Sequence, residues 1–320
     1  MSFYYRLPAA LIAATIAIVQ PEFAVAQLSP QQVEEEIDRN ECNQSGAIDF
    51  NEAIRLNPND AEAYNGRGAF RSQQGDIEGA IADYNEAIRL APNDADAYYN
   101  RAFVRSKQGD IEGAIADYNE AIRLTPNEAK AYNYRGFVRS QQGDIKGAIA
   151  DYNEAIRLDP NYVEAYSNRG FVRSQQGDKQ GAVADYNEAM RLNPSYGKVY
   201  GNRGYSRSQE GDIQGAIADF NEFIRLDPND AKAYNYRGYL RSQQGDIQAA
   251  IADFNEALRL DPNDADAYYN RAGVRNEQRD KQGAINDFQK ASELYQQQGD
   301  TDAYRDAQNA IRELQKELEV

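Results

Sequence analysis

The chain of 320 residues carries 35 Lys and Arg against 51 Asp and Glu, which gives a net charge of −16. An acidic surface of this kind repels nucleic-acid phosphates and anionic lipid headgroups, so neither is expected as a partner. Because the sequence contains no histidine, it also lacks the usual general base, the commonest metal ligand and the side chain that titrates near neutral pH.

Residues 1–26 have the three parts of a secretory signal peptide. A positive charge in MSFYYR precedes the apolar run Leu7–Val19, and Ala24–Ala26 forms a small-x-small cleavage pattern. A membrane anchor is the alternative, but the apolar run is shorter than the roughly 20 residues that span a bilayer. We therefore expect a chain that begins at Gln27 after cleavage and is exported to a periplasm, a thylakoid lumen or the extracellular space. Cys42 is the only cysteine, so it is either a free thiol or a crosslink to a partner.

The rest of the sequence is built from repeats. The ten residues IADYNEAIRL occur at 81–90, 115–124 and 149–158, and looser copies continue the series at intervals of 34 residues. The prolines that follow the copies keep this interval and are Pro58, Pro92, Pro126, Pro160, Pro194, Pro228 and Pro262. Self-similarity at a fixed period indicates a structural repeat, in which each copy buries its faces against a nearly identical neighbour. The verbatim repetition is therefore a packing pattern.

Each copy is expected to form a helix hairpin. In the copy at 61–94, apolar residues at steps of three and four indicate an amphipathic second helix: Ala80, Ile81, Tyr84, Ala87, Ile88 and Ala91. The preceding segment AEAYNGRGAFRSQQ has a similar spacing. Gly75 can end this first helix, Asp76 can cap the second, and Pro92 prevents its continuation.

The spacing of key residues resembles the tetratricopeptide repeat (TPR) pattern. The matching positions of the first full copy are Tyr64, Arg67, Gly68, Arg71, Ala80, Tyr84 and Pro92. The resemblance implies an all-α protein, an α-solenoid that winds as a right-handed superhelix of TPR hairpins. It implies a degenerate N-terminal repeat at 27–60, seven tandem repeats at 61–298 and a capping helix at 299–320, which closes the open end of the stack. The amino-acid sequence of the repeats resembles that of exported TPR proteins of cyanobacteria.

Two columns of arginine depart from the family pattern, which has an aliphatic and an aromatic residue in these places. They are Arg67, Arg101, Arg135, Arg169, Arg203, Arg237 and Arg271, and Arg71, Arg105, Arg139, Arg173, Arg207, Arg241 and Arg275. An unpaired charge on a packing stripe is costly. One interpretation is a ligand-binding row of arginines. The other, favoured by the in-phase repetition, is a ladder with Asp83, Asp117, Asp151, Asp185, Asp219, Asp253 and Asp287.

The sequence offers little for catalysis. It has no phosphate-binding loop and no cluster of Cys and His for zinc. Its acidic residues recur in every copy, whereas an active site needs one unique constellation. We therefore expect a non-enzymatic protein without a cofactor or bound metal. A carboxylate-dependent hydrolase and a glycan-binding envelope module are the alternatives of another class.

The resemblance also implies a binding surface, because the first helices of TPR hairpins line a concave groove that receives extended peptides or partner proteins. Carried over position by position, this groove contains Tyr99, Phe103, Ser106, Asn133, Tyr134, Phe137, Ser140, Phe171, Ser174, Tyr205, Asn235, Tyr236, Tyr239 and Tyr269. Aromatic anchors beside small polar groups are typical of protein-binding surfaces. The alternative for Phe103, Phe137 and Phe171 is packing between adjacent helices. The expected function is a scaffold for a neutral or basic protein or peptide, or more narrowly an assembly factor for envelope or photosynthetic complexes.

The repeat at 197–230 differs from its neighbours. Its first helix contains Gly197 and Gly201, and Phe223 stands where the other full repeats have a small residue. Glycine weakens a helix locally, which predicts a soft joint between about Pro194 and Tyr205. The alternative is that the missing side chains make room for the phenylalanine.

Overall fold

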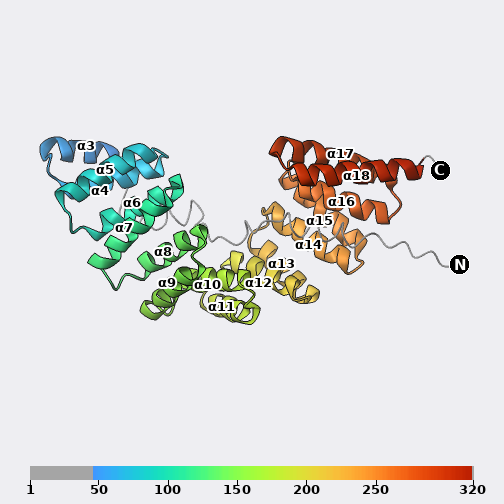
Figure 1. Ribbon diagram of the computed structural model, residues 1–320, viewed down its shortest axis with the longest axis horizontal. Helices are drawn as coiled ribbons and strands as arrows, with labels where there is room; N and C mark the ends of the chain where they lie inside the picture. The colour runs from blue at the N-terminus through green and yellow to red at the C-terminus, as the bar shows by residue number, and fades with distance from the viewer. Residues whose placement is uncertain (1–45, 319–320) are drawn as a thin grey trace. The chain divides into compact units, whose positions relative to one another are not determined.

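The computed structural model describes residues 46–318, with side chains from Phe50 onward, and every regular element of this part of the chain is an α-helix (Figure 1). The predicted signal peptide, Cys42 and most of the degenerate first repeat lie outside the described residues. The expected all-α fold is confirmed. The helices form consecutive hairpins, as in an α-solenoid. They belong to two compact units, and the boundary lies between residues 192 and 193.

The first unit contains α3 (Gly46–Leu56), α4 (Ala61–Gln73), α5 (Ile77–Leu90), α6 (Ala95–Gln108), α7 (Ile111–Leu124), α8 (Ala129–Gln142), α9 (Ile145–Leu158), α10 (Val163–Gln175) and α11 (Lys179–Leu192). The second contains α12 (Gly197–Gln209), α13 (Ile213–Leu226), α14 (Ala231–Gln243), α15 (Ile247–Leu260), α16 (Ala265–Glu277), α17 (Lys281–Gln298) and α18 (Thr301–Leu318). In each unit a helix packs against the next one in the chain, and the first helices of successive hairpins also touch.

The turn inside each hairpin follows the predicted Gly-Asp signal. Gly109 has a φ of 86°, a left-handed conformation that suits glycine, and it ends α6. The next residue, Asp110, caps α7 by accepting a hydrogen bond from the Gly113 backbone N–H at 3.0 Å. In the last full repeat Arg279 takes the left-handed conformation, with a φ of 64°.

The core of each hairpin comes from three columns of the second helix. In α5 these are Ala80, Tyr84 and Ala87, all of them buried. Gly68 of α4 lies over the Tyr84 ring, and a Cβ at this position would come within 2.8 Å of Tyr84 Cε1. A small residue is thus required at Gly68 because the two helices approach closely. The buried alanines of α5 are required for a similar reason, since protein interiors are tightly packed.

Helix α18 covers the end of the second unit. Ala310, Ile311 and Leu314 are buried against Ala272 and Phe288 of the last hairpin. Leu318, at the end of this helix, is 52% exposed, so the buried face ends at Leu314. The helix gives the last hairpin the neighbour that a terminal repeat otherwise lacks.

The packing of the 197–230 repeat agrees with the second of the two interpretations. Phe223 is only 3% exposed. A Cβ at Gly201 would lie 2.9 Å from its ring, and one at Gly197 would lie 3.4 Å away. The two glycines therefore accommodate the phenylalanine within a filled core.

Candidate protein-interaction surface

All of the predicted partner-binding residues lie on the first helices of the hairpins. These helices are α6, α8 and α10 in the first unit and α12, α14 and α16 in the second. We call the surface formed by their predicted side chains the A-helix face and treat it separately in each unit. Asn133, Tyr134 and Asn235 are buried, and the other predicted residues are partly exposed.

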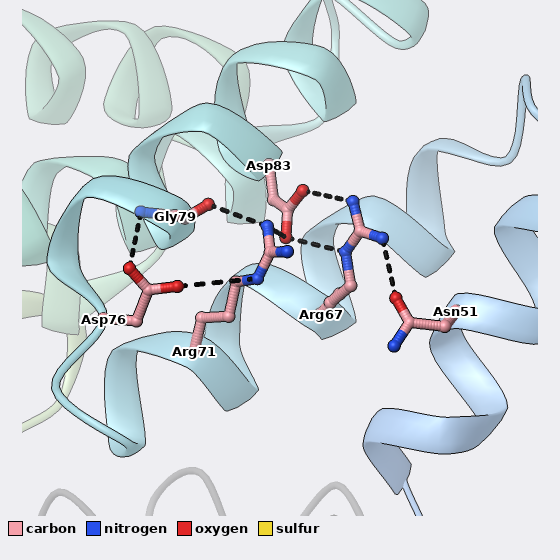
Figure 2. Close-up of polar contacts among 6 residues, drawn as sticks. All are labelled: Asn51, Arg67, Arg71, Asp76, Gly79 and Asp83. Atoms are coloured by element: carbon pink, nitrogen blue, oxygen red, sulfur yellow. Dashed lines mark hydrogen bonds and ion pairs between the residues drawn. The ribbon is translucent and has the colours of Figure 1, made fainter.

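Beneath this face each hairpin holds a buried ion-pair network (Figure 2). Arg67 donates from Nε and Nη2 to the two carboxylate oxygens of Asp83, at 2.9 and 2.6 Å. Arg71 donates from Nη1 to Asp83 Oδ2 at 2.7 Å. Because Asp83 is buried, the two guanidinium groups provide the charge and hydrogen bonds that its carboxylate has lost from water.

The same network recurs in both units. The bidentate pairs are Arg101–Asp117, Arg135–Asp151 and Arg169–Asp185, then Arg203–Asp219, Arg237–Asp253 and Arg271–Asp287, at 2.5 to 2.7 Å for their shorter contact. The second arginines, Arg105, Arg139, Arg173, Arg207, Arg241 and Arg275, contact the same aspartates at 2.8 to 2.9 Å. The predicted ladder is confirmed, and its partly exposed arginines are engaged with buried aspartates.

The ladder also joins neighbouring hairpins. Arg67 Nη1 donates to Asn51 Oδ1 of α3 at 2.8 Å, and its guanidinium lies 5.4 Å from the Tyr64 ring centroid. The asparagine column to which Asn51 belongs was not predicted from the sequence. This column could have been found in the sequence from the Asn-Glu dipeptide that every verbatim copy contains.

Asparagines on the A-helix face form a second set of links between hairpins. Asn168 Nδ2 donates to Asn133 Oδ1 at 3.1 Å, and Asn270 Nδ2 donates to Asn235 Oδ1 at 3.0 Å. Asn133 and Asn235 are 4% and 7% exposed. These two predicted binding residues therefore hold hairpins together and leave little surface for a partner.

Aromatic residues take the place of these asparagine links between α6 and α8. Tyr134 meets Tyr99 and Phe103 edge-on, with ring centroids 5.6 and 5.8 Å apart, and it stacks on Tyr118. Phe103 and Phe137 pack against this cluster and remain partly exposed. The two rings thus pack between helices, as the alternative expected, and remain part of the surface; whether they bind a partner stays a prediction.

The A-helix face of the second unit is lined by tyrosines. Tyr205 meets Tyr236 edge-on at 6.1 Å, and Tyr236 stacks on Phe220 at 5.5 Å. Tyr269 packs edge-on against Phe288 at 5.0 Å. Burial raises the pKa of Tyr239 and, together with the negative charge of Asp306, raises that of Tyr269 to about 12.

Two of the predicted serines are turned towards their own helices. Ser106 Oγ donates to the Phe103 carbonyl and Ser140 Oγ to the Phe137 carbonyl, both at 2.7 Å. The side chains are partly exposed, so their oxygens can accept a further hydrogen bond from a bound backbone.

An acidic corner lies beside the A-helix face of the second unit. Burial raises the pKa of Asp264 to about 6, and it also raises that of Asp266. The Tyr295 hydroxyl donates to Asp266 Oδ1 at 2.6 Å. In the sequence the acidic loop 261–266 is explained by helix capping, and the contact of Asp266 with Tyr295 was not predicted because Tyr295 belongs to the extension of α17.

Neither a metal centre nor a membrane span is found in the part of the chain that the structure describes. Within residues 46–318, no group of three or more Cys, Asp or Glu side chains is arranged to hold a metal ion. No helix in this range is both long and apolar enough to cross a bilayer.

Helix hairpins in tandem, with a small-residue and aromatic core repeated in each, define a helical-repeat protein. Models of the TPR repeat match 71–109, 104–143 and 140–177, and models of the tetratricopeptide repeat match 50–82, 163–196, 202–265 and 237–302. The chain belongs to the tetratricopeptide repeat family. No curated protein matches its sequence.

Several solved structures have a similar fold. A chain of the APC/C hetero-tetramer Cut9–Hcn1 is 19% identical with a TM-score of 0.65, over 83% of this chain and 52% of that one. A tetratricopeptide repeat protein from Parabacteroides merdae is 21% identical with a TM-score of 0.62, over 78% and 98%. Pseudomonas aeruginosa pilF is 22% identical with a TM-score of 0.58, over 65% and 94%. The chain thus spans about half the length of the Cut9–Hcn1 chain. At these identities the likeness concerns the fold alone.

Proposed function

We propose that this protein is a non-enzymatic scaffold that binds an extended peptide or protein segment on its A-helix face. The observation that carries the proposal is the row of partly exposed aromatic side chains on successive first helices, such as Phe103, Phe137 and Tyr239. Such rings supply much of the binding energy of protein interfaces. Tetratricopeptide repeat proteins bind peptide or protein partners, which agrees with this role.

The distribution of charge supports binding over catalysis. The recurrent aspartates are held by two arginines each, as Asp151 is by Arg135 and Arg139. A carboxylate held in this way is a poor general base, because its lone pairs are already occupied. The family is generally a non-catalytic scaffold, and the proposal follows it.

The partner is proposed to be neutral or basic. The net charge of −16 attracts cationic segments at long range and repels anionic ones, which acts mainly on the rate of association and on specificity. The arginines cannot serve an acidic partner instead, since those of the ladder are engaged with buried aspartates.

We also propose that the protein works outside the cytoplasm, on the basis of the tripartite pattern in residues 1–26. The test is the mass of the native protein from the organism's exported fraction. A mature chain that begins at Gln27 is expected, and recovery of the uncleaved chain from the cytoplasm would contradict export.

Site-specific photo-crosslinking tests the binding function. A benzoyl-phenylalanine replaces Phe137 on the A-helix face, and a control chain carries it at Arg123, which is exposed on the second helix α7. Irradiation in the exported fraction should give a discrete adduct from position 137 that excess unlabelled chain suppresses. Equal adducts from both positions, or none that the competitor suppresses, would count against a partner on this face.

A further inference from the structure

Gly273 leaves an opening in the aromatic row of the second unit. The five preceding first helices carry a ring at the equivalent position: Phe103, Phe137, Phe171, Tyr205 and Tyr239. Helix α16 has glycine instead, and a Cβ built there would meet nothing within 4 Å. Its φ is not positive, so neither the turn geometry nor close packing requires glycine. Glycine weakens a helix relative to alanine, so the open space at this position comes at a cost in helix stability.

Two side chains of α16 border the opening, one turn before and one turn after Gly273. Tyr269 is partly exposed and is fixed by its edge-on contact with Phe288 at 5.0 Å. Glu277 lies on the other side. We call the space bounded by Tyr269, Gly273 and Glu277 the Gly273 notch.

Glu277 makes no ion pair with any residue in the described range 46–318. Two of the cations near Glu277 in the sequence are engaged elsewhere, whereas Arg279 makes no ion pair within the described residues. Arg275 contacts Asp287 at 2.9 Å, and Lys281 contacts Glu317 at 3.1 Å. Glu277 is exposed, and its neighbours still raise the pKa of its carboxyl group by desolvation. The negative charge of Asp306 also acts on Tyr269.

We propose that the Gly273 notch receives a lysine or arginine side chain of the bound segment. This inference rests on the proposed function and specifies the partner at one position. A cation fits here because it can lie over the Tyr269 ring and reach the Glu277 carboxylate. Its long aliphatic stem fills the volume that a ring occupies in the five preceding repeats. A peptide without a basic residue leaves the notch empty.

The experiment starts from a library of random twelve-residue peptides selected on the full chain. Selected peptides are resynthesised with each arginine replaced by citrulline, which keeps the shape and removes the charge. We expect one basic position at which citrulline lowers the affinity about tenfold. This change corresponds to the binding energy of a partly desolvated cation contact. Affinity is measured by fluorescence anisotropy at constant ionic strength.

Two variants test whether the preference for a basic residue arises at the notch. Gly273→Phe fills it with the ring that other repeats tolerate, and Glu277→Gln removes its charge. Both should reduce the citrulline effect to less than about twofold, within the range of exposed contacts. The control Glu112→Gln removes an exposed carboxylate on α7 in the first unit and should leave the tenfold effect intact.

The outcomes separate the two proposals. If peptides bind but Gly273→Phe and Glu277→Gln keep the full citrulline effect, the notch proposal is wrong and the scaffold proposal stands. If Gly273→Phe instead abolishes the contribution to affinity of an aromatic or aliphatic peptide residue, the notch takes an apolar group, and the proposal is also wrong. If the library yields no binder, the proposed function itself is contradicted, and the notch proposal with it.

Discussion

Arg135 holds Asp151 through two N–H···O contacts of 3.0 and 2.6 Å, one to each carboxylate oxygen, across the two helices of one hairpin. Asp151 is 3% exposed, and Arg139 makes a third contact to it at 2.8 Å. The carboxylate thus sits between two cations in a site from which most water is excluded. Removing it leaves two guanidinium groups without their counterion.

The first prediction is that Asp151→Ala lowers the free energy of unfolding by about 2–4 kcal/mol, because it breaks a buried pair from one side. The denaturant midpoint of the full chain measures the change. The matched control is Glu154→Ala on the same helix, which breaks only the exposed pair with Arg157 and should have little effect. Equal midpoints for the two variants would show that the ladder arginines are solvated.

A second prediction concerns two tyrosines at equivalent positions. The buried Tyr118 hydroxyl has no hydrogen-bond partner among the described residues, whereas interaction with Ser140 lowers the pKa of Tyr152 against the effect of burial. Tyr118→Phe should therefore stabilise the protein by about 1 kcal/mol, and Tyr152→Phe should destabilise it by a similar amount. Thermal unfolding of both variants decides, and a loss of stability in Tyr118→Phe would contradict the reasoning.

The third prediction tests the fit between Gly201 and Phe223. Gly201→Ala places a methyl group 2.9 Å from the Phe223 ring and should cost about 1–3 kcal/mol through overpacking. The control Gly273→Ala meets open space and should gain about 0.5–1 kcal/mol from helix propensity. In a Phe223→Ala background the cost of Gly201→Ala should disappear, and a double-mutant cycle without coupling would refute the fit.

A fourth prediction follows from the raised pKa of Asp264, about 6 against an ordinary 3.8. The folded state binds this proton more tightly than the unfolded state, so stability falls as the pH rises from about 4 to about 6 and stays lower at pH 7. Asp264→Asn keeps a capping oxygen and should raise the free energy of unfolding at pH 7 by about 1–2 kcal/mol. Melting curves at pH 5 and pH 7 should also differ less for the variant. An unchanged pH dependence would contradict this.

The sequence was sufficient to predict the hairpins, because the features that make them are local. The Gly-Asp turns, the capping aspartates and the Ala80, Tyr84 and Ala87 columns each act within one repeat or its neighbour. The ladder was predictable for the same reason, since charges of opposite sign recur in phase. Once one copy is understood, the others follow.

The candidate surface was less predictable, because it depends on differences between repeats. Asn133 and Tyr134 are adjacent in the sequence and both were expected to face a partner. Asn133 bonds to Asn168, whereas Tyr134 packs into a cluster with Tyr99 and Phe103. Which neighbour meets each side chain depends on the residue 34 positions away, and that pairing was seen only in the structure.

Amide hydrogen exchange of the full chain, with and without a peptide selected from the library, tests most directly whether the A-helix face binds the partner. The account predicts slower exchange on addition of peptide in first helices such as α8 and α14, which carry Phe137 and Tyr239. Exchange in the paired second helices α9 and α15 should change little. Slower exchange confined to α9 and α15, or no change in any helix at saturating peptide, would contradict it.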